Sequence, residues 1–254
     1  MARRDGATYP TVADKWRDPS LHGPEQFLGG ALAAGWDPGE IPEGAVFVFD
    51  HRLRTQLEQR SDAVEAPELA PGNARVFRIG SVIVSCLSPG AAAMVTQMQN
   101  LAYLGTRRFV IVGAAGSISE DVRPGATVIP TRAIRDDGIS QHYLPPSPYA
   151  TASAALSDRL RGALPDAVVG ATWTVPVPYR LTTRELEIHS ADGVVAVEME
   201  AAALFAVAEA IGVDAAAILV ISDVTTPNEH VEEWAATNDP LLHALEQSVR
   251  ALGR

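Results

Sequence analysis

Apolar residues are most concentrated in residues 194–223, and their spacing changes twice along this stretch. Residues 194–197 form a short run rich in Val, which predicts a buried strand. Residues 199–211 are rich in Ala with apolar residues at helical spacing and are followed by Gly212, so they predict a helix that ends at this glycine. Residues 215–221 predict a second buried strand. The stretch is therefore expected to form a strand, a helix and a strand.

Four polar residues stand at the expected ends of these two strands: Glu198, Glu200, Ser222 and Asp223. Two parallel strands joined by one helix form a right-handed crossover, which brings these residues to one edge of a sheet. Open α/β sheets bind their ligands at that edge. A structural interpretation is equally open, because acidic side chains also stabilise helix N-termini and cap the segments that follow strands.

The remaining apolar runs predict further elements. Strands are expected at residues 45–49, 74–79, 81–87, 108–112, 126–130 and 167–175, and helices at 52–59, 90–104 and 150–164. The strands at 74–79 and 81–87 are expected to pair as a hairpin. Residues 133–143 are expected to form a polar loop. Residues 1–44 are polar and rich in proline, which predicts a surface arm that packs on the domain or on a neighbouring subunit.

Composition narrows the class of protein. The chain has 254 residues, of which 47% are hydrophobic, as expected for one globular domain with a single core. Its net charge of −11 argues against a nucleic-acid partner and against an anionic membrane surface, so a small-molecule ligand is favoured. The single cysteine, Cys86, excludes an intrachain disulfide and favours a reducing cytoplasm. Cys86 lies in an apolar run, which indicates a buried, unreactive thiol.

Several motifs together resemble one known family. Val-Glu-Met-Glu-Ala-Ala at residues 197–202, followed by Ile-Ser-Asp at 221–223, is similar to the signature of the nucleoside phosphorylase superfamily. That superfamily includes purine nucleoside phosphorylases, uridine phosphorylases and methylthioadenosine nucleosidases. The resemblance extends to residues 110–122, 125–130 and 133–143, and covers most of the chain from about Ala45 onward.

The resemblance implies a fold and an assembly. It implies a single α/β domain over residues 45–254, with a central mixed, largely parallel sheet flanked by helices, preceded by an N-terminal arm over residues 1–44. It also implies a homo-oligomer, either a dimer or a trimer of dimers. No cofactor and no metal are expected, and inorganic phosphate is the co-substrate if the protein is a phosphorylase.

The resemblance also assigns roles to the motif residues. Glu200 is expected to bind the sugar hydroxyls, with Met199 packed under the ribose and Glu198 beside them. Asp223 is expected to be the acid at the leaving base, oriented by Ser222. Breaking a carbon–nitrogen glycosidic bond suits such carboxyl groups, because one offsets positive charge on the sugar while the other gives the base a proton.

Further candidates surround the base. The central strand runs into Gly-Ala-Ala-Gly at residues 113–116, where Ala115 and Gly116 are expected to border the nucleoside. A plain tight turn is the alternative interpretation of these small residues. Trp173 and Tyr179 are candidates for stacking on the base. Before the resemblance is used, core or interface packing is the favoured interpretation of these two aromatic side chains.

The expected phosphate site departs from the family pattern. Asp50 stands where a glycine is expected and Arg54 where the first arginine is expected. In the central strand Ile111 takes the place of a second arginine, and Ala114, after Gly113, takes the place of a phosphate-binding serine. Loss of a guanidinium and gain of a carboxylate each oppose anion binding, by about 1 kcal/mol or more in a partly desolvated site.

Two explanations of this departure remain open. In the first, another arginine rebuilds the anion site: Arg52, Arg54, Arg75, Arg78, Arg135 or one from a second subunit. In the second, water replaces phosphate and Asp50 or His51 acts as its base, as in a nucleosidase. An ordinary turn at the end of a strand is the structural alternative for Asp50 and His51.

The hypothesis from sequence is therefore an enzyme that cleaves the N-glycosidic bond of a purine-type nucleoside by phosphorolysis, giving free base and (deoxy)ribose 1-phosphate. A phosphate-independent nucleoside hydrolase is the second hypothesis. A non-catalytic nucleoside-binding module that kept the pocket and lost the attack site is the third. A small-molecule nucleoside is the expected partner in all three, with neither nucleic acid nor membrane involved.

Overall fold

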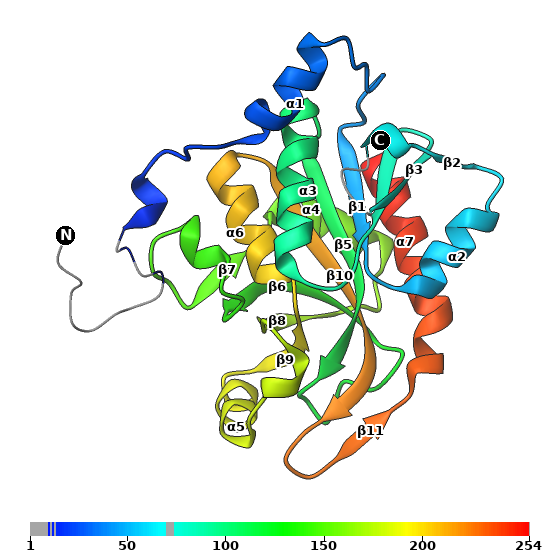
Figure 1. Ribbon diagram of the computed structural model, residues 1–254. Coiled ribbons are helices and arrows are strands. Elements are labelled where there is room, and N and C mark those ends of the chain that lie inside the picture. Colours follow the sequence, from blue (N-terminus) through cyan, green and yellow to red (C-terminus); the bar gives the residue numbers. More distant parts are fainter. Residues whose placement is uncertain (1–9, 11, 13, 70–73, 254) are drawn as a thin grey trace.

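The computed structural model describes residues 10, 12, 14–69 and 74–253, which form an eleven-stranded mixed sheet flanked by helices (Figure 1). The strands are β1 Gly44–Val48, β2 Ala63–Glu65, β3 Arg75–Ile79, β4 Val82–Cys86, β5 Arg108–Ser117, β6 Thr127–Arg135, β7 Tyr149–Thr151, β8 Val168–Thr174, β9 Val194–Glu198, β10 Asp214–Thr225 and β11 His230–Glu232. The α-helices are α1 Pro24–Ala33, α2 His51–Gln59, α3 Ala91–Leu104, α4 Ala154–Ala163, α5 Thr183–Ala191, α6 Ala201–Ile211 and α7 Asn238–Leu252.

The long strand β5 organises the sheet. It pairs in parallel with β1 on one side and with β10 on the other. On the β1 side the sheet continues as an open edge through β4, β3 and β2. On the other side β10, β6, β8 and β9 follow in order, and β9 pairs back onto the end of β5, so these five strands close into a ring.

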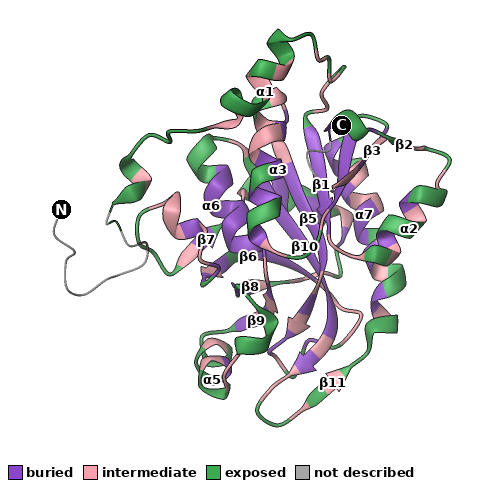
Figure 2. Ribbon diagram, in the orientation of Figure 1, coloured by how far each residue is buried: buried purple, intermediate pink, exposed green. Residues whose placement is uncertain are grey.

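Helices cover both faces of this sheet, and the core consists of two main layers. Helices α3 and α6 pack on one face, and α2, α4 and α7 pack on the other. In β1, Ala45 and Phe47 face the first layer, whereas Val46 and Val48 face the second. A strand covered on both faces is apolar at every position, which explains the continuous hydrophobic run. Figure 2 shows the buried strands at the centre and exposed residues on the outer helices.

The predicted fold class, a single α/β domain with a central mixed sheet flanked by helices, is confirmed. The hairpin over residues 74–87 is also confirmed, since β3 and β4 pair antiparallel from Arg75 with Cys86 to Ile79 with Val82. Gly212 ends α6 as expected, with a positive φ of 71°. Among the described residues, every helix is too short or too polar to cross a lipid bilayer.

The predicted crossover around α6 is wrong. Strands β9 and β10 are not parallel neighbours, because β5 lies between their ends: Gly116 pairs with Val197 of β9 in antiparallel register and with Asp223 of β10 in parallel register. The sequence predicted that this strand ends at residue 112, with a tight turn over residues 113–116 as one alternative. Instead β5 continues through them to Ser117 and offers β9 a pairing edge. The two strand ends nevertheless meet, one on each side of Gly116.

The predicted polar loop over residues 133–143 is only partly correct. Strand β6 extends to Arg135, so the loop starts later than expected. Arg135 and Asp137 are buried rather than solvated. Arg135 donates to the Ser140 and Leu144 carbonyls, and the Asp137 carboxylate accepts from the Ile139 and Ser140 amides. These side chains hold the loop in shape, which explains their burial.

Candidate active site

The Glu198 carboxylate lies at the start of α6 and satisfies the first backbone groups of that helix. Its Oε2 accepts hydrogen bonds from the amides of Glu200 and Ala201, both at 2.7 Å. Its Oε1 accepts one from Thr174 Oγ1, at the end of β8, at 2.5 Å. The Thr174 hydroxyl oxygen in turn accepts from the Ala202 amide. Glu198 therefore ties β8, β9 and α6 together, which is the structural role considered from the sequence.

Glu200 is buried beside Glu198 and contacts a distant part of the chain. Its Oε1 accepts a hydrogen bond from the amide of Gly90, the residue that precedes α3. Only 6% of the surface of each of these two glutamates is exposed. Met199 between them is half-buried and packs against the cluster that contains Trp173. The motif thus places one carboxyl group at a helix cap and the other against a loop amide.

Burial changes the acidity of this pair. Desolvation raises the pKa of Glu198 to about 7, although Thr174 and two backbone amides oppose the rise by hydrogen bonding to the carboxylate. Desolvation, followed by the negative charge of Glu198, raises the pKa of Glu200 to about 8, against hydrogen bonds from the Gly90 and Met199 amides. Near neutral pH the two groups therefore hold a proton that ordinary glutamates would have released.

Asp223 lies in β10, which pairs with the end of β5 on the side opposite β9. Its Oδ1 accepts a hydrogen bond from Ser222 Oγ at 2.7 Å, and Ser222 Oγ also lies 3.2 Å from the Ala115 carbonyl oxygen. A Cβ atom placed on Gly116 would lie 3.0 Å from Asp223 Oδ2 and 3.2 Å from Val197 Cγ1. The backbone of β5 thus passes close to the Asp223 carboxylate, and any larger residue at this position would displace Asp223 or Val197.

These pairings bring together the two strands that end near the predicted sugar and base residues. Strands β9 and β10 flank β5 at Gly116, so they lie about 10 Å apart, twice the usual spacing of neighbouring strands. Glu198 directly follows Val197, the partner of Gly116, and opens the segment that carries Glu200. Asp223 is therefore in one outer strand, and Glu198 is the last residue of the other.

The predicted phosphate residues are engaged in structural contacts. Asp50 caps α2, and its carboxylate accepts hydrogen bonds from the Arg52 amide and guanidinium. Burial opposes ionisation of Asp50, but these bonds from Arg52 hold its pKa below the ordinary value. Arg52 also donates to the Trp234 carbonyl, Thr237 Oγ1 and Asn238 Oδ1, which joins α2 to the start of α7.

The other arginines considered for the anion site also have partners elsewhere. Arg54 lies on the exposed side of α2, with its Nε 3.8 Å from a Glu58 oxygen. The remaining arginines contact other groups: Arg75 contacts Glu65 and Glu58, Arg78 contacts Glu68 and the carbonyls of Pro38 and Glu40, and Arg135 contacts Ser140, Leu144 and Pro145. Gly113 packs near the Phe49 ring, and Ile111 belongs to the core.

The two candidate aromatic side chains lie in contrasting environments. Trp173 is only 1% exposed, belongs to a core cluster with Leu186 and Val194, and donates from Nε1 to Asp136 at 3.3 Å. This is the packing interpretation considered from the sequence. Tyr179 is 98% exposed in a short 3₁₀ helix after β8, so within this chain it lies in solvent.

Sequence reasoning missed several participants. Gly90 and Thr174 bind the two glutamates, and Thr225 and His230 continue the contacts of Asp223 along the β10–β11 hairpin. A Ser/Thr residue at a strand end and a glycine before a helix were visible signals, but neither indicates its partner. Across the described residues there is no cluster of three or more His, Cys, Asp or Glu side chains placed to hold a metal ion.

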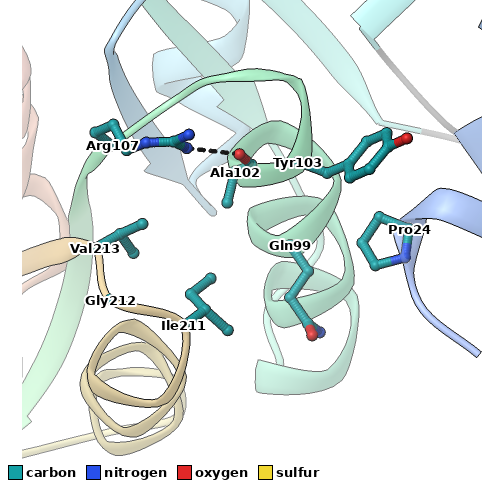
Figure 3. Close-up of a pocket in the computed structure, with 8 residues that line it drawn as sticks. All are labelled: Pro24, Gln99, Ala102, Tyr103, Arg107, Ile211, Gly212 and Val213. Atoms are coloured by element: carbon teal, nitrogen blue, oxygen red, sulfur yellow. Dashed lines mark hydrogen bonds between the residues drawn. The ribbon is translucent and has the colours of Figure 1, made fainter. Parts of the chain in front are cut away.

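A cavity of about 330 Å³ lies away from these carboxylates, between α1, α3 and the end of α6. Figure 3 shows Pro24 of α1 facing α3, with Ile211 and Val213 on the opposite wall. The Arg107 guanidinium there donates to the Ala102 carbonyl at 2.7 Å. Because none of the predicted site residues lines this cavity, it is separate from the candidate active site.

Comparison with known proteins identifies the class. The family model described as "Phosphorylase superfamily" matches residues 42–252, and the chain therefore belongs to this superfamily. A DeoD-type purine nucleoside phosphorylase from Bacillus cytotoxicus is 31% identical over 156 residues, covering 58% of this chain and 66% of that protein. A uridine phosphorylase from Treponema pallidum is 32% identical over 186 residues, covering 66% of this chain and 69% of that protein.

Solved structures agree on the fold. A uridine phosphorylase from Vibrio fischeri superposes with a TM-score of 0.71 at 19% identity, covering 85% of this chain and 94% of that one. A purine nucleoside phosphorylase from Toxoplasma gondii, in complex with immucillin-H, gives a TM-score of 0.72 at 17% identity, covering 84% and 92%. The family model confirms the expected family, and these structures confirm the expected fold.

Proposed function

We propose that this protein cleaves the N-glycosidic bond of a purine-type nucleoside by phosphorolysis, releasing the base and (deoxy)ribose 1-phosphate. The observation that carries the proposal is the placement of carboxyl groups on β9 and β10, on either side of Gly116. Membership of the phosphorylase superfamily supports it, as do relatives named as purine nucleoside and uridine phosphorylases.

In the proposed reaction the C1′–N9 bond breaks and its electron pair moves to the purine, while Asp223 gives a proton to N7. A lone pair of a phosphate oxygen forms the new bond to C1′. The bond from Ser222 Oγ orients the Asp223 carboxyl group for this step. Glu200 binds the sugar hydroxyls in place of the Gly90 amide. As positive charge develops on the sugar, the Glu198–Glu200 pair stabilises it electrostatically. A uracil base offers no N7 to protonate, and for this reason we propose a purine.

One observation favours a second candidate, hydrolysis by water. Arg52, Arg54, Arg75, Arg78 and Arg135 all have protein partners in the structure. A phosphate dianion needs cationic donors, and a guanidinium already bound to a carboxylate is a poor one. Asp50 is itself bound to Arg52, so the proposed water-activating base at this strand end is His51, the first residue of α2.

Incubating the protein with inosine, adenosine and uridine, with and without inorganic phosphate, tests both candidates. Phosphorolysis predicts base release only with phosphate, together with ribose 1-phosphate. Phosphate-independent release with free ribose would exclude it in favour of hydrolysis. Recovery of unchanged nucleoside after saturating binding would exclude both and support a binding module. Asp223→Asn is expected to lower turnover about 10²-fold for purine nucleosides.

Assembly and organisation complete the proposal. We propose a cytoplasmic homo-oligomer without a cofactor, in which residues 1–44 form an arm and residues 45–254 the nucleoside-binding domain. Exposed apolar side chains on the arm helix α1 support an interface role, since Phe27 is 74% exposed and Leu32 is 37% exposed. The match of the family model from residue 42 supports the proposed boundary.

A further inference from the structure

The β10–β11 hairpin carries a chain of polar side chains from Asp223 to the surface. Thr225 Oγ1 lies 3.4 Å from Asp223 Oδ2 and 3.0 Å from His230 Nδ1, and His230 Nε2 lies 3.2 Å from Glu232 Oε1. The antiparallel register places Asp223 opposite Glu232 and Thr225 opposite His230. Cross-strand partners share a face, so all four side chains lie on one face, while Val224 is fully buried on the other.

The number of available hydrogens determines which hydrogen bonds can form along this row of side chains. A hydroxyl group has one hydrogen, so when Thr225 donates to Asp223 it accepts from Nδ1 of His230. Donation from Nε2 to Glu232 requires a second ring hydrogen. Once Asp223 has given up its proton, all three contacts therefore form together only when the imidazole carries both protons. A cation here also offsets the repulsion between ionised Asp223 and Glu232, which stand directly opposite each other.

The surroundings of the hairpin do not compete for this imidazole. The nearest acidic residue in the turn, Glu229, is paired with Arg123 on the β5–β6 connection at 2.6 Å. The His230 side chain is 61% exposed, so its ring exchanges protons with solvent. Asp223 is only half-exposed and would be covered by the base bound against it. The hairpin thus offers a route for protons that a bound nucleoside leaves open.

We propose that His230, acting through Thr225, returns to Asp223 the proton that Asp223 gives to the leaving base; this inference rests on the proposed function. As the glycosidic bond breaks, its electron pair moves to the base and the Asp223 proton moves to a base nitrogen. The hydroxyl proton of Thr225 moves to Asp223 Oδ2, and the Nδ1 proton of His230 moves to Thr225 Oγ1. Neutral His230 then takes a proton from solvent, which completes the cycle. Thr225 and His230 are positioning residues, since neither contacts the nucleoside.

A matched pair of variants tests the hydroxyl. Thr225→Val removes it with little change of shape, and Thr225→Ser keeps it. With inosine we expect Thr225→Val and His230→Gln to lower kcat about tenfold or more, the usual size of an effect on proton transfer, with KM little changed. Thr225→Ser should restore most of the rate. His243→Gln on α7, an exposed histidine remote in sequence, controls for the loss of a surface histidine.

An N7-methylated purine nucleoside separates proton supply from general damage, because its base already carries a positive charge and leaves without a proton. The Thr225→Val and His230→Gln variants should cleave it at the wild-type rate. Equal rates for Thr225→Val and Thr225→Ser with inosine, or equal losses with both substrates, would overturn the proposal.

If the wild-type protein releases base from neither nucleoside, the proposed function fails, and NMR tests the hydrogen-bond chain on its own. The His230 Nδ1 resonance should then shift in Thr225→Val and stay in place in Thr225→Ser. An unchanged resonance in both variants would show that the hydrogen bond between Thr225 and His230 does not form.

Discussion

The Glu200 carboxylate accepts a hydrogen bond from the amide of Gly90 at 2.5 Å, although 110 positions separate the two residues in the sequence. Glu200 precedes α6 and Gly90 precedes α3, so this contact joins the starts of two helices that pack on the same face of the sheet. If Glu200 binds the sugar as proposed, a sugar hydroxyl would compete with Gly90 for the same oxygen. We therefore expect substrate binding to be coupled to the loop before α3.

Glu200→Gln should separate the catalytic from the structural contribution of this carboxyl group. Burial raises the pKa of Glu200 in the folded protein to about 8, whereas a glutamate in the unfolded chain has its ordinary pKa of 4.5. Between these values the folded state binds more protons, so the free energy of unfolding falls as pH rises through this window. Glutamine cannot ionise, so the variant should lose part of this decline, on the order of 1 kcal/mol or more at pH 8.

Thermal melts at pH 4, 6 and 8 measure this effect. We expect Glu200→Gln to match the wild type at pH 4 and to melt at a higher temperature at pH 8, while turnover falls about 10-fold to 10³-fold. Glu187→Gln, on the exposed side of α5, is the control and should leave the pH dependence unchanged. A variant with the same pH dependence as the wild type would contradict the buried, protonated state of Glu200.

Glu198→Ala should lower stability through the loss of the helix cap. The substitution leaves the amides of Glu200 and Ala201 and the Thr174 hydroxyl without their acceptor, at a cost of about 1–3 kcal/mol. Thr174→Val removes the hydroxyl alone and should cost less. Urea unfolding monitored by circular dichroism gives both values. If Glu198→Ala is more stable than the wild type, the carboxyl group is retained at a cost to stability, and its capping role is secondary.

How much of the fold could be predicted depends on how far apart in the sequence the interacting residues lie. Local patterns predicted the β3–β4 hairpin and the end of α6, because turn residues and hydrophobic spacing act over a few positions. The continuation of β5 through residues 113–116 was missed, since a run of glycine and alanine has low strand propensity and only pairing with β9 and β10 holds it extended.

In the candidate site, too, local features were predicted and contacts between distant segments were missed. The motif residues that follow strands β9 and β10 were found, because buried strands that end in acidic residues are rare enough to notice. Their partners were not, since Gly90 and Thr174 lie far from them in the sequence. The engagement of Arg52 with the segment before α7 likewise depends on tertiary packing. A single sequence carries no signal for such pairs.

Arg52→Ala should lower the free energy of unfolding much more than Arg54→Ala. Arg52 makes hydrogen bonds to Asp50, Thr237 and Asn238, so its loss should lower the free energy of unfolding by about 1–3 kcal/mol. Arg54 is exposed and its ion pair with Glu58 is long, so its loss should change stability by less than about 0.5 kcal/mol. Denaturant melts of both variants measure this difference.

The Arg54→Ala variant also tests which nucleophile the protein uses. If Arg54 turns from Glu58 to hold phosphate, Arg54→Ala should raise the KM for phosphate about tenfold or more, with the KM for nucleoside unchanged. An unchanged phosphate KM would remove Arg54 from the anion site. A Glu58→Gln variant is the matched control, since it frees Arg54 from its partner and should lower the phosphate KM if the side chain moves.

Gly116→Ala should displace the Asp223 carboxyl group, the proposed acid, without changing the backbone conformation. Gly116 is not among the glycines with positive φ, so alanine fits the strand, but its Cβ would lie 3.0 Å from Asp223 Oδ2 and 3.2 Å from Val197 Cγ1. The Asp223 carboxyl group must therefore move, and we expect kcat for purine nucleosides to fall about 10-fold to 10²-fold, with a stability loss of about 1–3 kcal/mol from overpacking. Gly162→Ala in α4 is the control, because its Cβ meets nothing within 4 Å and alanine favours a helix. Full activity of Gly116→Ala would show that the position of Asp223 does not limit the reaction.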